Sequence, residues 1–170
     1  RSSASISAGG KYTNRPTVTF SPMTGEKFMR AIIEPIPAVR VLSVIESGYD
    51  ARYVLETCPS SINGLRNRPA PTGQVRPADE NFARLMEVIS QVQAAGIIGF
   101  RIERPAQGEA LCVTVFSRPK GDPETESASR EVKALLGLDP EQDRFVVVRG
   151  DVRGPQGQLA MQTRSMLQVL

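Results

Sequence analysis

The chain has few residue types that could carry nucleophilic or acid–base chemistry. It contains no His, which removes the usual general base and every Ser-His or Cys-His pair. Its two cysteines, Cys58 and Cys112, stand far apart without a CxxC spacing, so they do not indicate a structural zinc site within one chain. Both lie among apolar neighbours, which is typical of buried free thiols, although an exported protein could instead join them in a disulfide.

Carboxylates are the remaining candidates for catalysis. Asp50 and Asp79 stand at expected helix starts, where a carboxylate caps the helix. Glu103 and Asp151 could serve a hydrolase or transferase only if they converged in a deep pocket. No stretch has the spacing of a calcium loop or of a phosphate-binding glycine loop. We therefore expect no catalytic residues, no cofactor and no metal.

Three polar clusters beside apolar segments fit neither a core nor a simple solvated surface. They lie at 14–17, 61–67 and 162–165, and each combines side chains that imitate backbone hydrogen bonding with an Arg. Two interpretations stay open: networks that lock loops inside the fold, or a binding surface. The candidate interaction residues are Arg15, Thr17, Asn63, Arg66, Asn67, Thr163 and Arg164.

Length and charge limit the classes of protein to which the chain could belong. Its 170 residues, 40% of them hydrophobic, suffice for one compact domain. The net charge is +3, and neither residues 1–78 nor residues 79–170 hold the dense basic stripe of a nucleic-acid-binding protein. Of the 21 basic residues 17 are Arg, which favours planar hydrogen bonding to carboxylates. No apolar run is long enough to predict a transmembrane segment.

Hydrophobic periodicity and turn residues predict the elements that would position these side chains. Four breakers within 66–79 predict a loop, and the longest helix follows it. In that helix Phe82, Leu85, Met86, Ile89 and Val92 recur with helical spacing and should face the core. Strands are predicted at 17–20, 97–102, 110–116, 145–148 and 159–163, and helices begin after Thr24, at Pro37, and after Asp50, Asp79, Thr125 and Ser165.

This order of elements predicts an α+β fold. An N-terminal helical segment precedes the order α-β-β-α-β-β-α, with two antiparallel hairpins and the helices on one face of the sheet. The hairpins should turn at 105–108 and 154–157, and Phe28, Ala31 and Ile32 should bury the first helix. The expected organisation, within one compact domain overall, is an extended arm at 1–20, a helical subdomain at 21–65, a Pro-rich loop at 66–79 and an α+β subdomain at 80–170.

The phrases RPTVTFSPMTGEKF (15–28), SINGLRN (61–67) and MQTRSMLQVL (161–170) carry a resemblance. In this order they resemble a group of uncharacterised bacterial exported proteins, in which such phrases often follow a lipoprotein-type signal. The resemblance covers most of the chain and implies an envelope location with a lipid anchor in a preceding region, but no catalytic residue. The chain begins at Arg1 and ends in an apolar, helix-like segment, so we expect it to be part of a longer protein.

These observations lead to an expected function. We expect a non-enzymatic structural or interaction module of the bacterial cell envelope, in the periplasm or at the outer membrane, within a larger protein assembly. Its partners should be proteins or further copies of itself rather than nucleic acid, and residues 1–20 are a candidate for strand addition to a sheet edge. Both hairpins also leave edges that need pairing or protection. The alternative is a hydrolase or transferase that acts on an envelope polymer with its carboxylates.

Overall fold

The computed structural model describes residues 19, 22, 24–70, 75–118, 121–155 and 157–170. The arm expected at 1–20, with its strand at 17–20 and the candidates Arg15 and Thr17, therefore lies outside the described residues except for Thr19. The loop expected at 66–79 is described on both sides of 71–74, and its described part beyond Arg66 contains neither helix nor strand.

The described elements confirm an α+β protein. Short helices come first, and pairs of strands then alternate with longer helices. In chain order the elements are α1 (Gly25–Ile33), α2 (Ala38–Glu46), α3 (Ala51–Thr57), β1 (Pro59–Ile62), β2 (Leu65–Arg66), α4 (Glu80–Ala94), β3 (Ile98–Glu103), β4 (Leu111–Phe116), α5 (Pro123–Leu136), β5 (Arg144–Arg149), β6 (Gln158–Thr163) and α6 (Met166–Val169).

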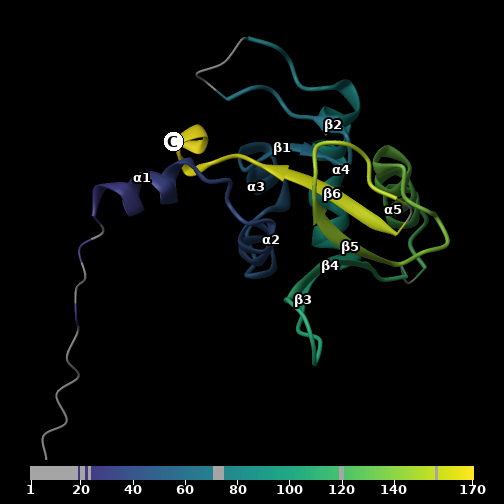
Figure 1. The fold of residues 1–170 in the computed structure, drawn as a ribbon. Helices are drawn as coiled ribbons and strands as arrows, with labels where there is room; N and C mark the ends of the chain where they lie inside the picture. The colour runs from purple at the N-terminus through teal and green to yellow at the C-terminus, as the bar shows by residue number, and fades with distance from the viewer. Residues whose placement is uncertain (1–18, 20–21, 23, 71–74, 119–120, 156) are drawn as a thin grey trace, which may run out of the picture.

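The described strands form one mixed sheet in the order β2-β1-β6-β5-β4-β3. In Figure 1, β2 and β3 lie at its opposite edges. The hairpin expected between 97–102 and 110–116 is confirmed as β3 and β4, which pair antiparallel from Ile98 opposite Phe116 to Glu103 opposite Leu111.

The second expected hairpin is wrong. β5 and β6 are neighbours but run parallel, with Val146 opposite Gln158 and Arg149 opposite Met161. The connection at 150–157 therefore returns along the sheet instead of turning tightly at 154–157. Alternating apolar residues specify that a segment is a strand, but the direction in which it pairs depends on contacts distant in sequence.

A hairpin that we did not predict joins β1 and β2. Residues 59–62, expected within the helical segment at 21–65, are a strand of the common sheet and pair with β6. The loop between β1 and β2 is Asn63-Gly64, with φ of 47° and 85°. Asn-Gly is the favoured pair for a two-residue turn with positive φ at both positions, so the signal was present in the sequence.

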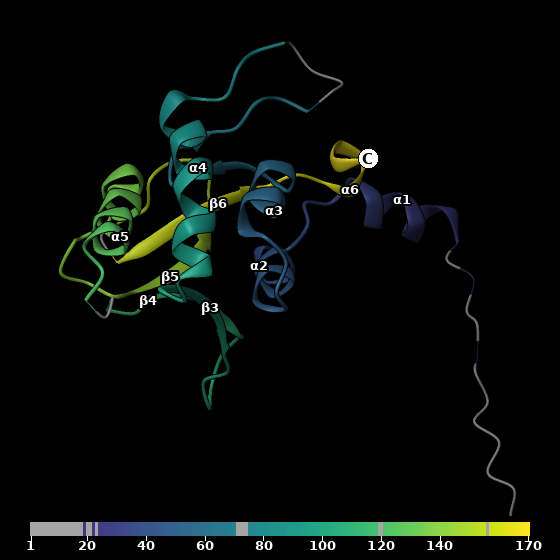
Figure 2. The same ribbon diagram turned by 180° about the vertical axis from the view of Figure 1, so that it is seen from behind.

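The core lies between the sheet and the helices on one of its faces. Figure 2 shows α3, α4 and α5 together on the near side of the sheet, and Figure 1 shows them behind it. The apolar face predicted for α4 is confirmed, because Phe82, Leu85, Met86, Ile89 and Val92 are all buried. They share one apolar cluster with residues of β5 and β6, among them Phe145, Leu159 and Met161.

The first helix departs from the expectation. No residue of α1 is buried: Phe28 is 50% exposed, and Met29 and Ile33 are similarly open. Figure 1 shows α1 projecting from the body beside α6, where Met166 and Leu167 are also exposed. The amphipathic pattern of α1 predicted the helix correctly, but periodicity does not guarantee a surface of the same chain on which to bury it.

The expected helix caps are confirmed in part. The Asp50 carboxylate accepts from the backbone N–H of Arg52 at 2.8 Å, and the helix after Thr24 begins as expected, although Thr24 makes no side-chain cap bond. Thr125 was the wrong cap, because α5 begins at Pro123 and Asp122 caps it. Proline at the first helical position costs no hydrogen bond, which explains the earlier start.

No helix in the described ranges has both the length and the apolar character needed to cross a membrane.

Candidate anion-binding pocket

A cavity of about 730 Å³ opens at the β2 end of the sheet. Its walls come from the β1–β2 hairpin, the loop that follows it, the connection at 151–153 and the start of α6. Segments far apart in sequence therefore meet here, including two of the polar clusters singled out above. The described residues that line it include five arginines and one carboxylate: Arg66, Arg68, Arg76, Arg153, Arg164 and Asp151.

Asn63 forms the turn that shapes one wall. Its backbone N–H donates to the Ala160 carbonyl at 2.6 Å, and its side-chain oxygen accepts from the Ala160 N–H at 3.2 Å. Its side-chain Nδ2 donates to the carbonyl of Leu136, at the end of α5. Asn63 is buried and does not line the cavity, so it locks the hairpin to β6 and α5.

Asn67 and Thr163 also serve as locks. Asn67 donates from Nδ2 to the carbonyls of Glu56 at 2.8 Å and Pro59 at 2.9 Å, which fixes the loop against the end of α3. The Thr163 hydroxyl donates to the Ile36 carbonyl and joins β6 to the segment after α1. For these buried side chains the geometry favours the loop-locking interpretation, although Asn67 also reaches the cavity wall.

Arg66 on β2 and Arg76 in the loop after it share one carboxylate, that of Asp79. Arg66 Nε lies 3.8 Å from Asp79 Oδ2, and Arg76 Nη1 lies 3.6 Å from Asp79 Oδ1. Asp79 also accepts from the backbone N–H of Arg66 at 2.8 Å, so this carboxylate closes the edge of β2 instead of capping α4 by a side-chain bond. One carboxylate between two guanidinium groups leaves this wall positive.

Arg164 is the most unusual residue of the cavity. Its side chain belongs to a residue only 6% exposed, and it donates to the carbonyls of Thr57, at 3.0 Å, and Arg68. Every Asp and Glu of the chain lies within the described residues, and none of them pairs with Arg164. Burial, followed by the nearby charge of Arg68, lowers the pKa of the Arg164 guanidinium from its usual value. The group still stays protonated, because a guanidinium does not lose its proton in a protein.

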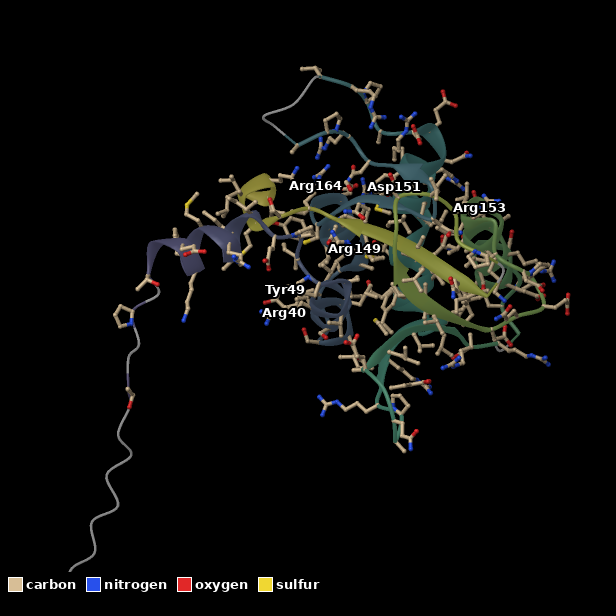
Figure 3. The ribbon with its side chains drawn as sticks, viewed as in Figure 1. Arg40, Tyr49, Arg149, Asp151, Arg153 and Arg164 are labelled. Carbon is tan, nitrogen blue, oxygen red and sulfur yellow. The ribbon has the colours of Figure 1, made fainter. Side chains whose placement is uncertain are left out.

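Arg153 reaches the cavity through the returning connection. Its guanidinium packs directly over Gly137, the left-handed residue that ends α5, where an added Cβ would overlap Arg153 Cζ. A cation there complements the negative end of the α5 dipole. Figure 3 shows Arg164, Asp151 and Arg153 along the same end of the sheet.

Ser61 adds an unused polar group to the wall. Its residue is 3% exposed, and its hydroxyl has no hydrogen-bond partner among the described residues. Buried hydroxyl groups normally find a partner, so this one is free to donate to a bound acceptor. The net arrangement is a concave, cation-rich surface with a free hydroxyl, which is suited to hold a carboxylate or another oxyanion.

The other residues considered for chemistry lie apart from this cavity. Glu103 is on β3, at the far edge of the sheet, where it pairs with Arg144. Cys58 and Cys112 are free thiols, and burial raises the pKa of both, to about 11 for Cys112. High thiol pKa values make these cysteines poor nucleophiles at neutral pH.

Three of the candidate residues predicted from the sequence line the cavity, namely Arg66, Asn67 and Arg164. Arg68, Arg76 and Arg153 also line it but were not predicted as candidates. Arg68 and Arg76 stand in a loop that was interpreted only through its Pro and Gly residues. Arg153 reaches the cavity only because β5 and β6 are parallel, which no local pattern indicated. A search with protein-family models finds no match to the chain, and comparisons with curated proteins and with solved structures find no match either.

Proposed function

We propose that the protein is a non-enzymatic interaction module of a larger assembly and that it binds an acidic segment of a partner protein in the arginine-lined pocket. A single observation carries this proposal: Arg164 holds a buried positive charge that no carboxylate of its own chain neutralises. A buried, unpaired charge is costly, and a carboxylate supplied by a partner would offset that cost.

The surrounding groups suit such a ligand. Guanidinium groups present planar pairs of N–H donors that match the two oxygens of a carboxylate. Arg68 is exposed and lies close enough to Arg164 for their positive charges to repel each other. An anion bound between the two guanidinium groups would offset this repulsion. The Ser61 hydroxyl on β1, which has no partner among the described residues, would add a donor.

The envelope location is part of the same proposal and has separate support. It rests on the resemblance of residues 15–28, 61–67 and 161–170 to bacterial exported proteins. Two of these three phrases supply pocket residues, namely Arg66, Asn67 and Arg164. Within an envelope assembly the module would therefore use the segments that carry the resemblance to hold its partner.

The alternative, a hydrolase or transferase for an envelope polymer, has less support. Such chemistry requires two carboxylates that flank the reacting bond. Asp151 is the one acidic residue among the described lining residues of this cavity, and Glu103 is paired with Arg144 at the other end of the sheet. A second carboxylate would have to come from elsewhere.

Calorimetric titration with an acidic peptide tests the proposal. Hexaglutamate should bind the purified chain, hexaglutamine should not, and salt should weaken the binding by screening the charges. Arg68→Gln should weaken hexaglutamate binding about tenfold, since it removes a charge-assisted contact. Arg130→Gln is the matched control, because it removes the same charge from an exposed site on α5, where Arg130 pairs with Glu126.

Two results would count against the proposal. Equal loss of binding in Arg68→Gln and Arg130→Gln would mean that the peptide responds only to net charge. Turnover of an envelope polymer that Asp151→Asn abolishes would instead favour the enzymatic alternative.

A further inference from the structure

The β3 edge of the sheet is a second surface, distant from the arginine-lined pocket. β3 pairs with β4 along all six of its residues, and no other described strand pairs with it. It carries Arg101 and Glu103 on one face, and Ile102, which is 39% exposed, on the other. Edge strands of this length are normally protected or paired with another strand.

The register fixes which backbone groups point outward from β3. The Ser117 N–H donates to the Ile97 carbonyl at 2.6 Å, and these residues extend the β3–β4 register. In an antiparallel pair such hydrogen-bonded positions recur at every second residue. Gly99, Arg101 and Glu103 therefore bond to β4, whereas the N–H and C=O groups of Ile98, Phe100 and Ile102 point away from the sheet.

These outward groups have no partner within the described residues, since no hydrogen bond is found for them. They form a row of donors and acceptors on three alternate residues of β3. A second extended strand could pair with these groups without any change in β3 itself.

We propose that a second copy of this chain supplies that strand, with β3 of both copies antiparallel about a two-fold axis through Ile102. This register places Ile102 against Ile102 of the second copy and joins them by their outward backbone groups. It also places Arg101 of each copy directly opposite Glu103 of the other. Residues 101–103 of the two strands face each other in this register, and this stretch joins the two sheets.

Charge complementarity selects this register from its neighbours. An axis through Arg101 would place two arginines directly opposite each other, which is unfavourable. An axis through Phe100 would leave Arg101 opposite Gly99 and Glu103 opposite Ile97, without any charge pairing. With the axis through Ile102, Glu103 lies between its own Arg144 and Arg101 of the second copy, and the exposed surface of Ile102 is buried on both sides.

This inference is independent of the proposed function, because the pocket lies at the β2 end and stays open in the dimer. Sedimentation velocity over a range of concentrations tests it. The unmodified chain should dimerise reversibly, and Arg101→Glu should raise the dissociation constant at least about tenfold, because the introduced carboxylate repels Glu103 of the other copy. The double variant Arg101→Glu/Glu103→Arg should restore dimerisation in part, because it recreates the ion pair across the interface but loses the pair between position 103 and Arg144. Lys27→Glu, an equal charge reversal on exposed α1, is the matched control and should leave the dimer intact.

Cysteine crosslinking reports the register itself. Cys112 lies opposite Ile102 on β4, so the background carries Cys58→Ser and Cys112→Ala. Ile102→Cys in this background should give a crosslinked dimer on oxidation, because only residues on the axis approach their own copy closely. Arg101→Cys should not. A folded chain that stays monomeric at millimolar concentration, or crosslinking through position 101 but not 102, would overturn the proposal.

Discussion

The two edges of the sheet end in opposite ways. At the β2 edge, the backbone N–H of Arg66 donates to the Asp79 carboxylate and the Arg66 carbonyl accepts from the Asp79 N–H, so both edge groups are occupied. At the β3 edge, the backbone groups of Ile98, Phe100 and Ile102 have no partner among the described residues. The β2 edge is closed by hydrogen bonds within the chain and carries charged side chains. The β3 edge has backbone N–H and C=O groups that no described residue binds.

This difference separates two kinds of binding surface. At the β2 edge recognition would depend on guanidinium groups in loops that buried polar side chains hold in place. This edge would therefore select a ligand by its charge. At the β3 edge it would depend on backbone hydrogen bonds, which any strand of suitable register can make, and side chains would choose among registers. Substitutions can test whether the two edges differ as described.

The largest effect is expected at Asn63, which holds the β2 edge together. Asn63→Ala leaves the Leu136 carbonyl and the Ala160 N–H without their partners in a buried place. Loss of these bonds should lower the free energy of unfolding by about 4 kcal/mol. Urea denaturation measures the change, and Asn81→Ala, on the exposed side of α4, should change it little. Similar values for the two variants would contradict the role assigned to Asn63.

A smaller effect is expected where Arg153 crosses the end of α5. Gly137→Ala introduces a Cβ both at a positive φ and at the place that the Arg153 guanidinium occupies. It should destabilise the chain by about 2 to 3 kcal/mol, whereas Gly96→Ala, which has a similar φ but open space, should cost about 1 kcal/mol. Thermal or chemical denaturation compares them, and a Gly96 variant that costs as much would show that the contact with Arg153 adds nothing.

Proline substitutions compare the two edges directly. Arg66→Pro removes an N–H that donates to Asp79 and should cost about 2 kcal/mol. Ile102→Pro removes an N–H that points outward, so the folded monomer should lose less than about 1 kcal/mol. Urea denaturation at low concentration, where any dimer dissociates, measures both. The reverse order of the two costs would refute the description of the edges.

The smallest effect is expected from acid at the β3 edge. A hydrogen bond from Arg144 holds the pKa of Glu103 below its usual value, and Arg84 does the same for Glu131 between α4 and α5. A lowered pKa in the folded state stabilises the fold at neutral pH, and this contribution is lost as the pH falls through the folded-state value. Both pairs are exposed, so the losses should be slight.

Hydrogen exchange of the β3 amides at neutral and acidic pH measures this effect. After correction for the intrinsic pH dependence of amide exchange, the protection of these amides should fall slightly in acid in the unmodified chain and in Arg84→Gln. In Arg144→Gln the acid-dependent part should disappear. An acid response of β3 that is the same in both variants would assign it to groups other than Glu103.

Part of this architecture could be predicted from local pattern. The face of α4, the β3–β4 hairpin and the α+β class follow from periodicity and turn residues, which act within a few positions. Asn63, Asn67 and Thr163 were singled out because polar side chains beside apolar segments need partners, and the structure places them in such bonds.

The remainder depends on contacts that local pattern does not contain. The parallel pairing of β5 and β6 brings Asp151 and Arg153 beside the β1–β2 hairpin, and a tight turn at 154–157 would not have required this. The exposure of α1 likewise depends on its position outside the body of the protein, which its amphipathic sequence does not specify. The pocket therefore could not be predicted as a unit, although Arg66, Asn67 and Arg164 were among its candidates.

The measurement that tests the central claim most directly is NMR of the arginine side chains during titration with hexaglutamate. The Nε–Hε signals of Arg68 and Arg164 should shift together and saturate, because a bound carboxylate would pair with both guanidinium groups. The signal of Arg130, on the distant surface of α5, should stay in place. Shifts of similar size at all exposed arginines, with Arg164 unchanged, would show nonspecific attraction and contradict a built anion site at Arg164.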